Sequence, residues 1–209
     1  MHGSSSARSR TALRAPIANE GERAHFQRRL AFSLLVVFFL AFGFWLVTIS
    51  AHPFFGRGSI SVLFLGRTST AQLMTTFSAL IAYLVLRARA WSVDFLDAVD
   101  VLATLAICVG WGFMATAEGA ARRPELVGVL AISYTLVTRT AFVPSTALRT
   151  AALGTASFLP LIPETYSMYT SDVVTSAALE RANVLPLAPT VYVGIWSVLG
   201  VACTSTISH

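Results

Sequence analysis

Residues 30–51 read LAFSLLVVFFLAFGFWLVTISA and contain no charged side chain over 22 positions. As an α-helix at 1.5 Å per residue, this stretch is about 33 Å long, which is enough to cross a hydrocarbon core of roughly 30 Å. Arg23, Arg28 and Arg29 come before it. Because positively charged flanks stay in the cytoplasm, the stretch predicts a first transmembrane helix whose far end emerges outside.

The composition of the whole chain agrees with a membrane protein. Of 209 residues, 55% are hydrophobic and 12% are charged, whereas soluble proteins have about 25% charged residues. All 15 basic residues are arginines, and the formal net charge is +5. Since these arginines flank apolar segments, membrane topology and anionic lipid headgroups explain them better than nucleic acid does. The expected partner is the lipid bilayer.

The apolar segments predict an all-α integral membrane protein, a bundle of about six transmembrane helices. Residues 1–27 are polar and are expected to form a disordered basic cytoplasmic tail. Residues 28–209 are expected to form the membrane domain, with spans near 30–51, 68–86, 99–117, 126–143, 147–162 and 189–207. Small residues in the fifth span predict an interior helix. Because the fourth and fifth spans are short, a re-entrant hairpin is the alternative for them.

The arginines also predict the topology. On the six-span scheme ten arginines lie inside and five outside, which places both termini in the cytoplasm. A homodimer through the transmembrane helices is the assembly we consider.

Three carboxylates, Asp94, Asp97 and Asp100, precede the third span at intervals of three residues. Ser92 is placed to cap this helix, so the acids would face the positive end of its macrodipole. A proton or cation relay is the alternative, but it would require an acid at mid-membrane. We therefore expect these acids to be charges of the cytoplasmic interface.

Four arginines are predicted at the same interface. Arg87 and Arg89 close the second span, and Arg139 and Arg149 lie on either side of a turn at residues 143–145. Long arginine side chains near helix ends can snorkel to the headgroups at modest cost, which is the behaviour we expect of Arg139. Arg149 starts the fifth span near the same interface.

Residues 164–186 form the longest predicted connection and are expected outside. Tyr166 and Tyr169 suit a membrane interface and would equally suit a small-ligand cleft. With Asp172 and Arg181, they are the candidate residues of an input loop leading into the sixth span.

No catalytic or nucleotide-binding motif is present. The sequence has no lysine, so neither a Walker phosphate loop nor a kinase nucleotide site is complete here. The four histidines and the two cysteines, Cys108 and Cys203, show no metal-ligand spacing. We expect this chain to be no enzyme, with no metal and no cofactor of its own.

Residues 138–163 (TRTAFVPSTALRTAALGTASFLPLIP) and the closing VACTSTISH, 201–209, carry a family resemblance. They resemble the amino-terminal multi-span region of bacterial transmembrane serine/threonine protein kinases, in which an arginine, a Val-Pro-Ser turn and a second arginine join the fourth and fifth spans. Here these are Arg139, residues 143–145 and Arg149. The resemblance implies a multi-pass protein of the bacterial inner membrane.

In such kinases the last span passes into a juxtamembrane helix and a kinase domain that uses ATP and Mg²⁺. The present sequence departs from this pattern because it stops at His209, and we expect a cytoplasmic portion to begin there. The resemblance thus implies a membrane anchor and signal-input domain of a serine/threonine kinase. A small permease that uses Asp94, Asp97, Asp100 and Glu118 as polar contacts is the alternative.

Overall fold

The computed structural model describes residues 20–55, 66–116, 124–171, 177 and 187–207. Within these ranges the regular structure is entirely helical, without strands. The helices are α2 (Glu20–Phe55), α4 (Arg67–Ala88), α5 (Val93–Thr116), α6 (Pro124–Phe142), α7 (Ala147–Phe158), α8 (Leu161–Ser171) and α10 (Leu187–Ile207). The predicted all-α membrane bundle is confirmed.

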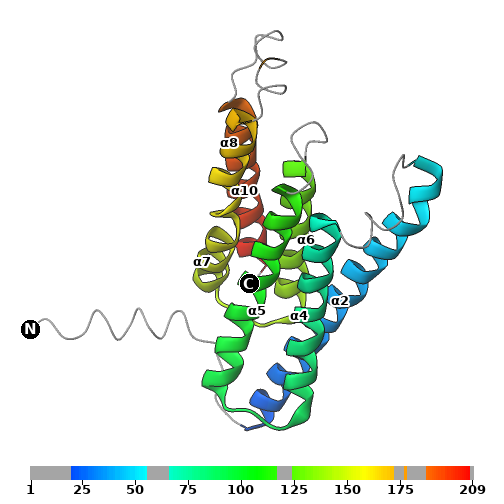
Figure 1. Ribbon diagram of the computed structural model, residues 1–209. Coiled ribbons are helices and arrows are strands. Elements are labelled where there is room, and N and C mark those ends of the chain that lie inside the picture. Colours follow the sequence, from blue (N-terminus) through cyan, green and yellow to red (C-terminus); the bar gives the residue numbers. More distant parts are fainter. Residues whose placement is uncertain (1–19, 56–65, 117–123, 172–176, 178–186, 208–209) are drawn as a thin grey trace, which may run out of the picture.

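The helices pack side by side, and α2 is inclined to the others (Figure 1). Helix α2 packs on α4, α4 on α5, and α5 on α6, while α10 packs on α6, α7 and α8. The sequence-distant helix α2 also meets α6, where the rings of Phe32 and Phe142 make an edge-to-face contact at 5.0 Å. The core thus combines helices from both halves of the chain.

Many large apolar side chains are exposed on the outer surface of this bundle. The exposed fraction is 61% for Phe39, 71% for Met74 and 69% for Val198. A soluble protein would bury such side chains, whereas in a bilayer the lipid tails solvate them. Five of the described helices are long and apolar enough to span a membrane: α2, α4, α5, α6 and α10.

Helix α2 begins earlier than the sequence suggested. It starts at Glu20, so residues 20–27, which we assigned to a disordered tail, form its first two turns. Phe26 is buried there, with 2% of its surface exposed, and Gln27 bonds to α4. These contacts explain why a polar stretch is helical: α4 provides partners that the isolated sequence lacks.

The predicted fifth span, 147–162, is not one transmembrane helix. Helix α7 ends at Phe158, and α8 begins at Leu161 and continues to Ser171. Pro160 interrupts the segment because proline has no N–H to donate and its ring clashes with the preceding turn. The two short helices follow one another along α10 (Figure 1) and together occupy the place of the predicted fifth span.

Small residues permit the closest helix contacts. A Cβ atom at Gly110 of α5 would overlap Oγ1 of Thr75 on α4, and one at Gly154 of α7 would lie 3.1 Å from Cγ2 of Val201 on α10. The fifth segment was predicted to be an interior helix, and Gly154 is indeed buried. The prediction does not hold for Ala152 and Ala156, which are exposed.

Candidate functional site

The start of α5 is organised as the sequence predicted. Ser92 Oγ accepts a hydrogen bond from the Phe95 backbone N–H at 3.4 Å, which caps the helix. Asp94 follows in the first turn and is exposed. A helix dipole stabilises anions mainly within that first turn. Asp97 and Asp100 lie further along the helix and must obtain their stabilisation elsewhere.

Asp100 is fully buried and binds Arg139 of α6 in a bidentate manner. Arg139 Nε donates to Asp100 Oδ1 at 2.8 Å, and Nη2 donates to Oδ2 at 2.6 Å. The exposed fraction of the two side chains is 3% for Arg139 and 0% for Asp100. Two parallel N–H···O bonds fix the orientation of both groups as well as their separation.

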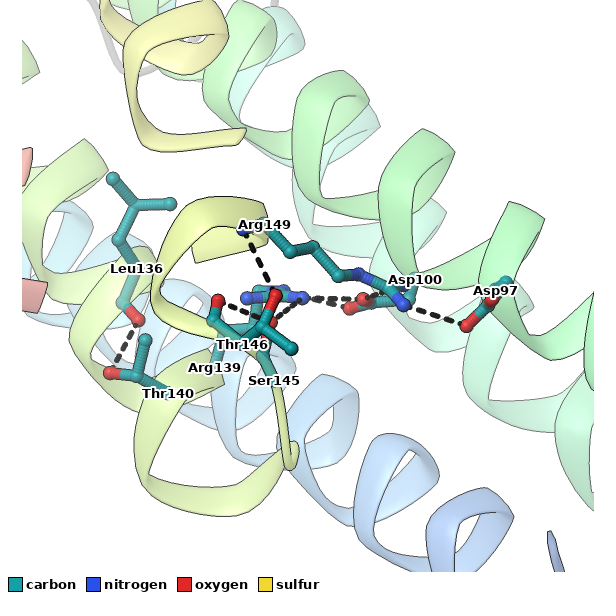
Figure 2. Close-up of polar contacts among 8 residues, drawn as sticks. All are labelled: Asp97, Asp100, Leu136, Arg139, Thr140, Ser145, Thr146 and Arg149. Atoms are coloured by element: carbon teal, nitrogen blue, oxygen red, sulfur yellow. Dashed lines mark hydrogen bonds and ion pairs between the residues drawn. The ribbon is translucent and has the colours of Figure 1, made fainter. Parts of the chain in front are cut away.

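Arg149 of α7 completes the cluster by joining both acids. Its Nη2 donates to Asp100 Oδ2 at 2.7 Å, and its Nη1 donates to Asp97 Oδ1 at 2.8 Å. Figure 2 shows both guanidinium groups converging on Asp100, with Asp97 at the edge. We call these four residues the charge network. It links α5, α6 and α7 and has two negative and two positive charges.

The turn between α6 and α7 brings the two arginines together. Thr146 Oγ1 accepts a hydrogen bond from the Arg149 backbone N–H at 3.3 Å and so caps α7. Ser145 Oγ lies 3.5 Å from Arg139 Nη2, and Val143 is buried, with 1% of its surface exposed. Pro144 cannot continue α6 because it has no N–H. The turn therefore positions one arginine at the end of α6 and the other at the start of α7.

Burial gives this network a large influence on folding. A charge removed from water is costly unless it is paired and hydrogen-bonded, and removing one partner of a buried pair typically costs about 3–5 kcal/mol. Arg139 Nη1 and Arg149 Nε are also buried and have no hydrogen-bond partner among the described residues. The network holds three helices in one register, and its acids already accept bonds from two cations.

This arrangement corrects the sequence prediction for Arg139, which was expected to snorkel to the headgroups. Arg139 lies inside the bundle with 3% of its surface exposed, and Arg149, predicted near the same interface, is buried beside it with 4% exposed. Asp100 is likewise buried, and Asp97, with 19% of its side chain exposed, lies at the edge of the same cluster. Arg87 and Arg89 are exposed at the end of α4. Sequence reasoning counted the charges but did not pair them, although ionisable residues in membrane helices usually pair.

The candidate input residues are separated by the structure. Tyr166 is exposed on α8, whereas Tyr169 is buried and its hydroxyl donates to Glu125 Oε2 of α6 at 3.0 Å. The start of the predicted outer loop is thus helical and packed against the bundle. Asp172 and Arg181 lie outside the described residues, as does Glu118. Sequence analysis missed Glu125, which is 1% exposed.

No group of three or more histidine, cysteine, aspartate or glutamate side chains suitable for a metal ion occurs among the residues described. Cys108 is buried and Cys203 is exposed, each as a free thiol.

Comparison with protein-family models, curated proteins and solved structures found no match to this chain.

Proposed function

We propose that the chain is a non-catalytic helical membrane domain that anchors a cytoplasmic serine/threonine kinase in the bacterial inner membrane and conveys an input to it. One observation carries the proposal. The residues on which the resemblance to membrane-bound kinases rests, Arg139, the turn 143–145 and Arg149, are those that build the charge network with Asp97 and Asp100. The motif therefore has a physical role in the bundle.

The network suits an anchoring role because it makes three helix ends move as one unit. Helix α7 carries Arg149 at one end and contacts α10 through Gly154 and Val201. In the related kinases the last span leads to the cytoplasmic domain, and α10 occupies that position in the sequence. The charge network would hold α5, α6 and α7 fixed relative to one another. A shift of α8 against α10 would then be conveyed along α10. A ligand shifts such an equilibrium only if it binds the two arrangements unequally.

Reading the coding frame after His209 is the first test. We expect a basic juxtamembrane segment followed by a kinase domain with its lysine and metal-binding aspartate. A stop codon directly after His209, with no kinase sequence nearby, would refute the proposal.

Anchoring and input are separated by a second experiment on the full-length protein. Residues 172–186 would be replaced by a neutral linker of equal length, and autophosphorylation would be measured in membranes across growth conditions. If this segment conveys the input, the response to conditions is lost while basal activity persists. An unchanged response removes the input role and leaves the anchor.

A permease remains the competing function, and the geometry weighs against its proposed contacts. Asp97 and Asp100 each accept bonds from arginine, so neither is a ready ligand for a transported cation or proton. Uptake into vesicles that is lost in an Asp94→Asn variant with intact folding would favour the permease. Equal flux in protein-free vesicles would exclude it.

A further inference from the structure

A groove of about 630 Å³ lies between α2 and α4, at the end of the bundle where the first predicted span begins and the second ends. Its lining residues include three arginines, Arg28 from α2 and Arg87 and Arg89 from the end of α4. None of the lining residues that the structure describes is acidic. No carboxylate in the wall therefore balances the positive charge of this groove. The groove shares no residue with the charge network.

The two helix ends that form the groove are tied together by a neutral side chain. Gln27 Nε2 donates to the backbone oxygens of Leu86 at 2.5 Å and of Arg89 at 2.7 Å, and Gln27 Oε1 accepts from the Trp91 N–H at 3.2 Å. Gln27 thus satisfies carbonyls at the end of α4 that cationic side chains often satisfy. The guanidinium groups are not needed for that role.

The arginines are oriented by aromatic neighbours. Arg87 Nη1 donates to Tyr83 Oη at 3.0 Å, and the Arg89 guanidinium carbon lies 3.8 Å from the centroid of the Trp91 ring. A guanidinium group has five N–H donors, so these contacts leave donors for an anion. Arg28 is exposed on the facing helix. Each guanidinium group presents its N–H donors in a fork that matches the oxygen geometry of a phosphate group.

The groove becomes apolar in the direction of the membrane. Phe32 and Leu35 line it one and two turns beyond Arg28 on α2, and Phe32 is 49% exposed. A site that is basic at the interface and apolar further into the bilayer fits a molecule with an anionic head and a hydrocarbon tail. A free phosphate ion would use only the basic end.

We propose that this groove binds the phosphate headgroup of an anionic phospholipid, with an acyl chain along Phe32 and Leu35. Basic pockets between membrane helices on the cytoplasmic side are suited to such lipids. The bound lipid would connect α2 to α4 at the end where Gln27 already joins them. This proposal does not depend on any kinase that the chain anchors.

The test is lipid retention by the full chain, measured by native mass spectrometry after reconstitution in equal parts of phosphatidylglycerol and phosphatidylcholine. The wild type should retain phosphatidylglycerol preferentially. The double variant Arg28→Gln/Arg87→Gln should lose that preference by about ten- to thirty-fold, since each basic side chain near an anionic surface adds roughly a factor of five.

Arg23→Gln is the matched control, because Arg23 lies on the same helix but outside the groove and pairs with Glu20 at 3.8 Å. It should retain lipid as the wild type does. Equal loss in this control, or no loss in the double variant, would overturn the proposal.

Circular dichroism establishes folding, and if the double variant is unfolded, Arg28→Lys/Arg87→Lys replaces it. Lysine keeps the charge but not the fork, so we expect retention below wild type, and undiminished retention would overturn the proposal.

Inorganic phosphate identifies the source of the anion. If the occupant is a lipid, phosphate at millimolar concentration should displace little phosphatidylglycerol, because the acyl chain adds apolar contact that phosphate lacks. Complete displacement by phosphate would overturn the lipid assignment.

Discussion

Asp100 shows at the scale of a single residue why burial and pairing must be considered together. It has no exposed surface and lies beyond the reach of the dipole at the start of α5, so Arg139 and Arg149 provide its stabilisation. Asp94 lies on the same helix, two turns earlier, and it is exposed. The same residue type thus has two different roles within two helical turns.

Asp100→Asn should lower the free energy of unfolding in detergent by about 3–5 kcal/mol, because it leaves two buried arginines with one carboxylate. Asp94→Asn removes the same charge from an exposed position and should change stability by less than about 1 kcal/mol. Denaturant titration followed by circular dichroism measures both. Equal effects of the two substitutions would contradict the assignment of Asp100 as the centre of the network.

Tyr169→Phe should destabilise the fold by about 1–3 kcal/mol, because it removes the hydroxyl that donates to the buried Glu125 carboxylate. Tyr166→Phe is the control, since Tyr166 is 48% exposed on the same helix. Thermal unfolding in detergent compares the two variants. If Tyr166→Phe proves the more damaging, the packing of α8 against α6 is not as described.

At the scale of elements, the contact between α4 and α5 depends on the absence of a side chain at Gly110. A Cβ there would overlap the Thr75 hydroxyl, whereas a Cβ at Gly112 would meet no atom within 4 Å. Glycine in a helix ordinarily costs about 1 kcal/mol relative to alanine. The two glycines therefore predict opposite responses to the same substitution.

Gly110→Ala should destabilise the bundle by about 1–3 kcal/mol through overpacking, and Gly112→Ala should leave stability unchanged or raise it by up to about 1 kcal/mol. Both are measured by unfolding in the same detergent. Adding Thr75→Ala should recover part of the loss at Gly110, since it removes the overlapping oxygen. Two equally stable variants would show that α4 and α5 are further apart.

At the scale of the whole molecule, the helix ends with the most arginines determine the expected orientation in the membrane. The start of α2 and the end of α4 meet there, as the bonds from Gln27 show. The charge network joins the start of α5 to the α6–α7 turn. Positive flanks of short connections remain in the cytoplasm, so we expect this end of the bundle to lie inside.

Cysteine labelling tests that orientation in cells. On a background without Cys108 and Cys203, Ala90→Cys should resist a membrane-impermeant thiol reagent until the cells are opened, and Ala120→Cys should react from outside. Ala90 is exposed in the bundle, so protection reflects the membrane side. Labelling of Ala90→Cys in intact cells would reverse the topology.

Several features followed from the sequence by itself. Long uncharged runs such as 30–51 must be helical in lipid, because every backbone polar group needs an internal partner there. The Ser92 cap also followed from the sequence, because a serine hydroxyl just before a helix can accept a hydrogen bond from a backbone N–H of the first turn. These are local effects, and local sequence contains the information for them.

Only the tertiary structure decided which charges meet. Asp100 and Arg139 are 39 residues apart, and Asp97 and Arg149 are 52 apart. Periodicity gives the face of a helix but not its neighbour. The division of 147–171 into α7 and α8 is also tertiary in part, because α10 packs along both pieces. Pairing depends on how helices are placed in space, and that placement results from packing over the whole bundle.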